Sequence, residues 1–229
     1  MLKKTVQNKD YVQSLARGLN VIECFDEKHA RLTLSDVAKL TGLTRPSARR
    51  ALLTLQVLGY VAEANQQFCL TPRTLRLGYA YLSSEPLWKV AEEYIRDLGL
   101  KSGQTCSIAV LDGDEIVYVA RSASKRIVND YIGIGFRYPA YPTSLGRVLL
   151  AALPKVELDA YFTRVKLDKL TPHTIVQRNK LMKIIAEVRE KEWASADQEL
   201  DIGLRSIGVP IRDRSGHVVA AMHINAPYQ

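Results

Sequence analysis

The sequence contains few cysteines and has no long apolar run. Its 229 residues include 3 cysteines, none in a C-x-x-C pair, so we expect neither a disulfide framework nor a structural zinc site. We interpret Cys24, Cys69 and Cys106 as small buried apolar residues. Uncharged apolar runs such as residues 148–153 fall far short of the ~20 residues that a membrane-spanning helix needs. The sequence therefore predicts no membrane partner.

Signals for secretion and catalysis are also missing. The first residues carry Lys3, Lys4 and Lys9, but no apolar block of the signal-peptide type follows them, so a cytoplasmic location is expected. The sequence has no H-E-x-x-H, G-x-S-x-G or Walker pattern, and its 4 histidines lack metal-ligand spacing. We therefore expect no catalytic residues, no metal and no cofactor.

Positive charge is concentrated in the first part of the chain. Hydrophobic residues at 47% and charged residues at 24% are typical of a soluble globular protein long enough for two domains. Residues 1–85 carry 12 basic and 7 acidic side chains, and residues 37–62 include Arg45, Arg49 and Arg50 but no acid. Such a segment is typical of binding to a phosphate backbone. The alternative is an ordinary solvated helix face.

The first predicted helix is amphipathic. Leu15, Leu19, Ile22 and Phe25 recur at helical spacing after Ser14, which can begin a helix by capping it. We therefore expect a helix over about 14–25 with these four side chains on one buried stripe.

Two further helices are predicted on either side of a tight turn. Thr33 and Asp36 have the spacing of a capping box, which begins a short helix. Gly42 can adopt the positive φ that a sharp reversal requires. Thr44 then caps a third helix that has Pro46 in its first turn. This order of elements predicts a helix-turn-helix.

The third helix has the residues that DNA recognition requires. Its apolar residues fall on one side, which leaves the basic and hydroxyl side chains at the exposed N-terminal end. Arginine can pair with guanine, and serine and threonine can bond to base edges or phosphates. Residues 60–62 and 68–70 predict a two-stranded wing around the turn 63–67. A purely structural helical bundle is the alternative. The candidate DNA-binding residues are Thr44, Arg45, Pro46, Ser47, Arg49 and Arg50.

Two stretches of this region resemble the DNA-binding domain of the IclR family of bacterial transcription regulators. They are residues 11–19 (Y-V-Q-S-L-A-R-G-L) and residues 34–59 (L-S-D-V-A-K-L-T-G-L-T-R-P-S-A-R-R-A-L-L-T-L-Q-V-L-G). The opening resembles the branch of the family that controls catabolism of aromatic acids such as protocatechuate and 4-hydroxybenzoate. The resemblance implies a winged helix-turn-helix followed by an effector-binding domain.

The chain is expected to be organised as a winged helix-turn-helix domain (11–71), a linker helix (72–85) and a second domain (86–229). In the second domain, antiparallel hairpins are predicted at 106–120 and 205–225, and a strand at 127–132. Helices are predicted at 88–100, 144–153 and 171–193. This mixture gives an α+β fold. The IclR resemblance implies that this domain is GAF-like or PAS-like and encloses an effector cavity.

The resemblance also implies which residues surround that cavity. Free amides at the start of a helix near residue 144 would attract a carboxylate. Many relatives have serine at the two positions on the last strand that are His223 and Asn225 here, so this chain departs from the family pattern. The alternatives are a solvated acidic pair, an arginine paired for stability and a core histidine. The candidate effector-binding residues are Thr143, Ser144, Leu145, Asp197, Arg205, Ser206, His223 and Asn225.

The sequence therefore predicts a ligand-responsive transcription regulator. Its expected partners are double-stranded DNA, a small organic acid and further copies of itself as a homodimer or tetramer, because one domain offers too few base contacts for specific affinity. An effector-independent winged-helix DNA-binding protein is the alternative. The size of residues 86–229 argues against that alternative, because mere attachment to DNA does not need so large a domain.

Overall fold

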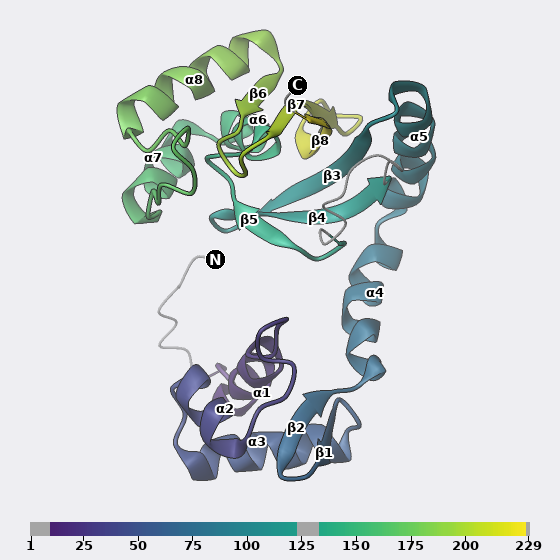
Figure 1. Cartoon of the computed structure of the whole chain (residues 1–229), viewed down its shortest axis with the longest axis vertical. Helices are drawn as coiled ribbons and strands as arrows, with labels where there is room; N and C mark the ends of the chain where they lie inside the picture. The colour runs from purple at the N-terminus through teal and green to yellow at the C-terminus, as the bar shows by residue number, and fades with distance from the viewer. Residues whose placement is uncertain (1–9, 123–132, 228–229) are drawn as a thin grey trace. The chain divides into compact units, whose positions relative to one another are not determined.

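The computed structural model describes residues 10–122 and 133–227 and divides the chain into two compact units (Figure 1). The first unit ends at Ser84 and the second begins at Glu85. The strand predicted at 127–132 lies outside the described residues. None of the helices in the described ranges is long and apolar enough to cross a lipid bilayer.

The first unit packs three helices together and ends in a two-stranded wing and a further helix. Its core contains Val21, Val37, Ala48 and Leu52, all completely buried. Its elements are α1 (Gln13–Glu23), α2 (Leu34–Thr41), α3 (Arg45–Val57), β1 (Val61–Ala64), β2 (Gln67–Leu70), the short 3-10 helix η1 (Pro72–Thr74) and α4 (Leu75–Ser84). The predicted helix-turn-helix with a wing is confirmed.

Local signals set the ends of α2 and the start of α3. The Thr33 hydroxyl accepts a hydrogen bond from the Asp36 amide, and the Asp36 carboxylate accepts one from the Thr33 amide at 3.0 Å. Gly42 ends α2 with a φ of 67°, a conformation that glycine adopts without strain. Thr44 then caps α3 by accepting a hydrogen bond from the Ser47 amide. The capping box, the glycine turn and the cap are therefore confirmed.

The expectation for α1 was wrong in two respects. The helix begins at Gln13 after Val12, which makes no side-chain cap, so Ser14 is not the capping residue. Of the expected buried stripe, Leu15 is 64% exposed and Leu19 46% exposed. The other two stripe residues, Ile22 and Phe25, do pack against the core, beside the completely buried Val21. Periodicity identified an apolar face, but it could not say whether anything in the same chain covers that face.

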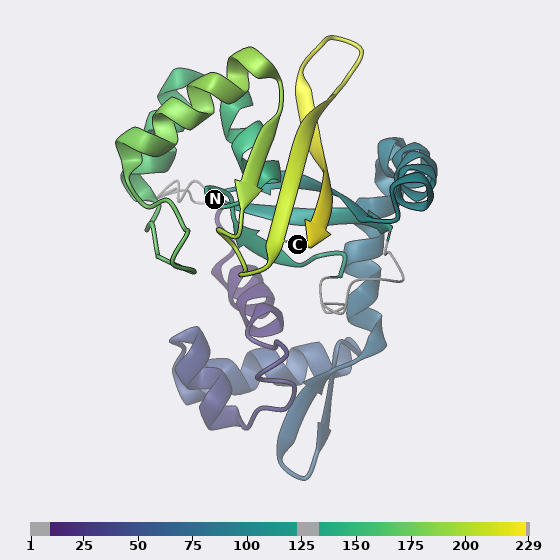
Figure 2. The same cartoon turned by 45° about the horizontal axis from the view of Figure 1, so that its top comes forward.

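The second unit is an antiparallel sheet with helices, as the α+β prediction required. The described strands form one sheet in the order β5-β4-β3-β8-β7-β6, and Figure 2 shows the long β7–β8 hairpin beside β6. Helix α6 packs across one face of this sheet, while α5 contacts β3 and β4. The elements are α5 (Pro86–Ser102), β3 (Thr105–Asp112), β4 (Glu115–Ser122), β5 (Arg137–Pro139), α6 (Ser144–Ala152), α7 (Lys155–Arg164), α8 (Arg178–Lys191), β6 (Ala194–Asp197), β7 (Leu204–Arg212) and β8 (Val218–Pro227).

Both predicted hairpins are present, but the long helix predicted at 171–193 begins only at Arg178. The hydroxyls of Thr171 and Thr174 each donate a hydrogen bond at 2.6 Å to the carbonyls of Gln198 and Glu199. These contacts hold the segment before α8 out of the helix. The sequence analysis also missed α7, β5 and β6.

A buried ion pair connects α6 with the segment after β6. Arg147 and Glu199 are 2% and 5% exposed, and the guanidinium donates a hydrogen bond to the Glu199 carboxylate at 2.6 Å. The same guanidinium donates to the carbonyls of Tyr141 and Ser195. The Glu199 carboxylate also accepts from the Ile175 amide at 3.1 Å. These hydrogen bonds compensate for the desolvation of both charges.

Gly146 allows the chain that leads into α6 to cross close to the helix. A Cβ at this position would lie 2.0 Å from the Ala140 carbonyl oxygen. The Gly146 amide donates a hydrogen bond to the Thr143 hydroxyl, which in turn donates to the Ala140 carbonyl. The start of α6 and the loop before it are therefore tightly packed.

We predict that Gly146→Ala lowers the free energy of unfolding by about 3 kcal/mol, because backbone must move to admit the methyl group. Urea denaturation of the full chain measures this change. Gly78→Ala in α4 is the control, since a Cβ there meets nothing within 4 Å and helix propensity predicts a small gain of about 0.5–1 kcal/mol. Equal stability of the two variants would contradict the packing argument.

Candidate DNA-binding surface and effector cavity

The N-terminal half of α3 presents its arginines to solvent. Arg45, Arg49 and Arg50 are all exposed, whereas Ala48 and Leu52 are completely buried. At 100° per residue, Arg50 lies about 160° round the helix from Leu52, so it points away from the core. None of the three arginines forms an ion pair with a residue in the described part of the chain. Their charge is therefore available to a phosphate or a base.

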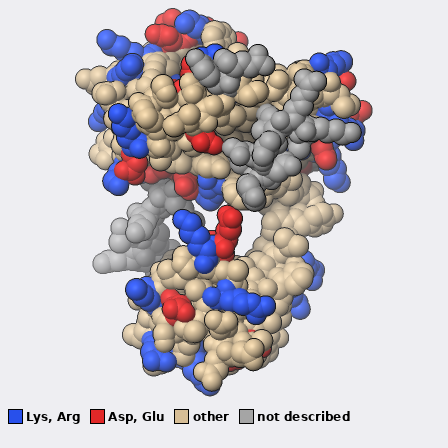
Figure 3. Space-filling view, in the orientation of Figure 1, with Lys and Arg blue, Asp and Glu red and all other residues tan. Residues whose placement is uncertain are grey.

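The hydroxyl residues at the start of α3 have different surroundings. Thr44 and Pro46 are exposed, but Ser47 is half-buried on the side of α3 that faces α1. Positive charge also spreads over the visible face of the first unit, with few acidic side chains (Figure 3). The start of α3 and the positive charge around it can bind a polyanion such as a DNA backbone.

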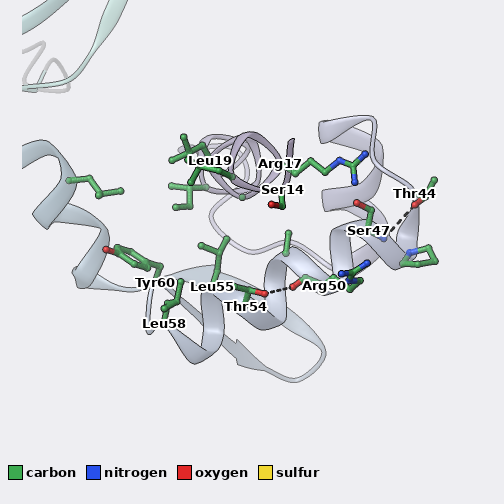
Figure 4. Close-up of a pocket in the computed structure, with 16 residues that line it drawn as sticks. Ser14, Arg17, Leu19, Thr44, Ser47, Arg50, Thr54, Leu55, Leu58 and Tyr60 are labelled. Atoms are coloured by element: carbon green, nitrogen blue, oxygen red, sulfur yellow. Dashed lines mark hydrogen bonds between the residues drawn. The ribbon is translucent and has the colours of Figure 1, made fainter. Parts of the chain in front are cut away.

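An open apolar groove lies between α1 and α3 in the same unit. Its volume is about 730 Å³, and Figure 4 shows Leu19, Leu55 and Leu58 along it. Ser14 and Arg17 of α1 lie at its polar side together with residues from the start of α3. Apolar surface gathered in one groove is typical of a site that another molecule covers.

The second unit encloses a small cavity on the face of the sheet that α6 covers. Its volume is about 20 Å³, which is room for about one water molecule. Four of the predicted effector residues line it. The lining consists of Tyr118, Pro142, Thr143, Ala196, Glu199, Leu200, Leu204, Ser206, His223 and Asn225.

His223 is buried in the wall of this cavity as a neutral imidazole. Burial, and secondarily the positive charge of Arg121, lower the pKa of His223 to about 3. Its Nδ1 lies 3.5 Å from the Ser144 hydroxyl at the start of α6, and the Tyr118 ring lies 5.9 Å away. Burial also raises the pKa of the Tyr118 hydroxyl. Both side chains are therefore uncharged at neutral pH.

Two predicted effector residues lie on the other face of the sheet. Asp197 and Arg205 are exposed and form a two-bond ion pair with each other, at 2.8 and 3.0 Å. Strand alternation puts Ala196 and Ser206 on the cavity side and therefore directs Asp197 and Arg205 away from it. The structure does not bring this pair together with His223 and Asn225.

The sequence analysis missed several residues of the cavity wall. Tyr118 comes from β4, and Pro142 from the loop before α6. Leu200 comes from the segment that joins β6 to β7, and Leu204 from the start of β7. No local pattern marks these positions, because each is an ordinary aromatic or apolar residue until the fold brings it to the cavity.

Two protein-family models match these two units. The model of the IclR helix-turn-helix domain matches residues 14–64, and that of the bacterial transcriptional regulator IclR C-terminal domain matches residues 79–229. This chain belongs to the IclR family. The predicted family is therefore confirmed.

Two similar proteins match nearly the whole length of this chain. The Pca regulon regulatory protein of Pseudomonas putida is 42% identical over 217 residues, which is 94% of this chain and 75% of that protein. A solved structure of a candidate transcriptional regulator from Rhodococcus sp. RHA1 is 53% identical with a TM-score of 0.81, and the match covers 95% of this chain and 87% of that one.

A third similar protein has been solved with a ligand. It is a double mutant of the inducer-binding domain of the PobR transcription factor from Acinetobacter in complex with 3-hydroxybenzoic acid. It is 31% identical with a TM-score of 0.56, and the match covers 61% of this chain and 81% of that one. The named relatives are regulators of transcription, and one from Acinetobacter baylyi is named as the p-hydroxybenzoate hydroxylase transcriptional activator. This chain is accordingly a DNA-binding transcription regulator and not an enzyme.

We predict that Arg45→Ala and Arg50→Ala weaken DNA binding in different ways. If Arg45 pairs with a base, its loss relaxes the preference for one base pair and costs about 1–3 kcal/mol. If Arg50 contacts a phosphate, its loss weakens binding evenly across sequences and reduces the salt slope by about one. Gel-shift titrations on a set of mutated operators at several salt concentrations measure both quantities.

Lys166→Ala is the matched control, because this exposed lysine follows α7 in the second unit and forms an ion pair with Asp168. It should leave sequence preference unchanged. The two assignments would be reversed if Arg45→Ala lowered DNA affinity equally for all sequences while Arg50→Ala lowered it only for particular base pairs.

Proposed function

We propose that this IclR-family regulator binds a near-palindromic operator as a homodimer or tetramer and responds to a small aromatic acid. We place it in the cytoplasm, because the bacterial chromosome that it would bind is there. The observation that carries the proposal is the pairing of exposed, uncompensated arginines on α3 with a buried polar cavity in the second unit.

In this proposal the start of α3 enters the major groove. Arg45, Ser47 and Arg49 contact base edges, while Thr44 and Arg50 contact phosphates. Pro46 fixes the first turn of the helix beside them without using an amide that the helix needs. Because Ser47 is half-buried, its short side chain can contact a base edge only where α3 lies close to the DNA.

The effector site in this proposal lies under the start of α6. The amides of Ser144 and Leu145 belong to the first turn, and the helix dipole there favours a negative group. Thr143, Ser206, His223 and Asn225 supply the polar wall of the cavity. The PobR domain solved with 3-hydroxybenzoic acid supports an aromatic acid as the ligand. Asp197 and Arg205 are not part of this site, because their ion pair lies on the other face of the sheet.

Self-association in this proposal uses the groove between α1 and α3. Leu15 and Leu19 expose apolar surface along it, and burying such side chains stabilises a complex by about 25 cal/mol per Å². A second copy that covers the groove brings another α3 to the same operator, since the exposed Thr44 and Arg50 are among the residues that line it. Two-fold symmetry of the protein then matches the symmetry of the DNA site.

We predict that an aromatic acid raises the melting temperature of the full chain. At a concentration of 100 times its Kd, a ligand that binds only the folded state adds about 2.7 kcal/mol, which is about 5–10 °C for a domain of this size. Scanning calorimetry with benzoate and hydroxybenzoates measures the shift. Benzylamine is the control, because it has the ring but a positive charge. No shift with any acid would favour the effector-independent DNA-binding protein.

We predict that the double variant Leu15→Ser, Leu19→Ser weakens self-association by about 100-fold and lowers operator affinity with it, because the apolar contact area is lost. Sedimentation of the full chain over a range of concentrations measures the change and also distinguishes a dimer from a tetramer. Val156→Ser is the control, since Val156 is 80% exposed in the second unit. An unchanged oligomer would exclude the groove as the interface.

A further inference from the structure

Two buried polar atoms in the cavity have no hydrogen-bond partner among the described residues. They are His223 Nε2 and Asn225 Oδ1, in side chains whose residues are 4% and 7% exposed. A buried polar atom without a partner costs about 1–3 kcal/mol. A native protein retains such atoms where another molecule satisfies them. Since both atoms line the same cavity, one ligand group can reach both.

Sheet register explains why the two atoms face the same space. His223 and Asn225 are two positions apart on β8, so their side chains leave the same face of the sheet. In the row of His223, the neighbour on β7 is Gly208, where a Cβ would lie 3.0 Å from the Ser144 carbonyl carbon. The missing side chain lets the start of α6 approach the sheet at this row.

The hydrogen-bonding roles of the two atoms follow from their surroundings. The Ser144 hydroxyl can donate to Nδ1 of the neutral His223 imidazole, and the proton is then on Nε2, which becomes a donor. Asn225 Oδ1 can only accept. The cavity therefore offers one donor and one acceptor that a single hydroxyl group satisfies together, because a hydroxyl both accepts and donates.

We infer that His223 and Asn225 are the specificity-determining pair of the effector site and that they recognise a ring hydroxyl of a hydroxylated aromatic acid. This inference rests on the proposed function, which places the carboxylate at the start of α6. Tyr118, whose ring lies 5.9 Å from that of His223, provides an aromatic wall for the ligand ring.

The ligand ring needs more space than the cavity of about 20 Å³ provides. The apolar part of the wall that can give way is Leu200 and Leu204, which belong to or border the segment between β6 and β7. The polar part is fixed, because Glu199 is held by Arg147 and Thr143 by Gly146. The ring therefore enters on the leucine side, with its hydroxyl toward β8.

The test compares two ligands of the same shape on two forms of the full chain. The ligands are 4-hydroxybenzoate and 4-fluorobenzoate, which share the carboxylate and the ring but differ in the hydrogen-bonding group. The variant is Asn225→Leu, which removes the acceptor with little change in volume. Isothermal titration calorimetry gives the four dissociation constants.

We expect the wild-type chain to bind 4-hydroxybenzoate about 10- to 100-fold more tightly than 4-fluorobenzoate. In the variant we expect this preference to fall about tenfold, because only His223 still faces the hydroxyl. The free variant should melt no lower than the wild type, because the substitution removes an unsatisfied buried atom, so loss of binding is separable from loss of folding. Met222→Leu is the control, since Met222 lies on the opposite face of β8 and should preserve the ratio.

Several results would overturn the inference, and they differ from a failure of the proposed function. Equal affinity of the wild type for both acids would show that no hydroxyl is recognised while an acid is still bound. An equal loss for both acids in Asn225→Leu, with the ratio preserved, would place the carboxylate at Asn225. Binding of no aromatic acid at all would overturn the proposed effector class together with the inference. The same measurement with 3-hydroxybenzoate and 3-fluorobenzoate tests a ring hydroxyl at the 3-position, and equal affinities within both pairs of acids overturn the inference.

Discussion

The second unit depends on the buried ion pair between Arg147 and Glu199. Three groups share the guanidinium, namely the Glu199 carboxylate and the carbonyls of Tyr141 and Ser195. The pair is therefore hydrogen-bonded through each of its donor nitrogens, which offsets the desolvation of its charges. Loss of either partner alone would leave a buried charge, at a cost of about 3–5 kcal/mol. Helix α6, the loop before it and β6 are held in one arrangement by this interaction.

That constraint positions the cavity. Glu199 is part of the cavity wall, and α6 is held with its first turn above Gly208 on β7. The polar groups around Arg147 are hydrogen-bonded within the protein, whereas His223 Nε2 and Asn225 Oδ1 have no partner among the described residues. Buried polar atoms without a hydrogen bond are rare in proteins and are expected mainly at functional sites. In the proposed function, the first polar cluster supports the fold and the second recognises the ligand.

In the first unit, interactions between residues close in sequence determine most of the helix ends and the turn. The capping box at Thr33, the positive φ of Gly42 and the cap at Thr44 fix the turn between α2 and α3. The arginines then follow on the exposed side of α3 and form no ion pair within residues 10–122 and 133–227. The same unit leaves the groove beside Leu19 uncovered, so its apolar surface and its DNA-binding surface meet at the start of α3.

The sequence by itself determined what depends on near neighbours: the helix ends, the turn at Gly42 and the two hairpins of the sheet. Only the tertiary structure decided what depends on contacts between distant segments. It shortened the predicted helix at 171–193 and left the first half of the α1 stripe, Leu15 and Leu19, exposed. It also separated Asp197 from His223 by placing them on opposite faces of the sheet. The reason is physical, since caps and turns are satisfied within a few residues, whereas burial and cavities need surfaces that come together only when the chain folds.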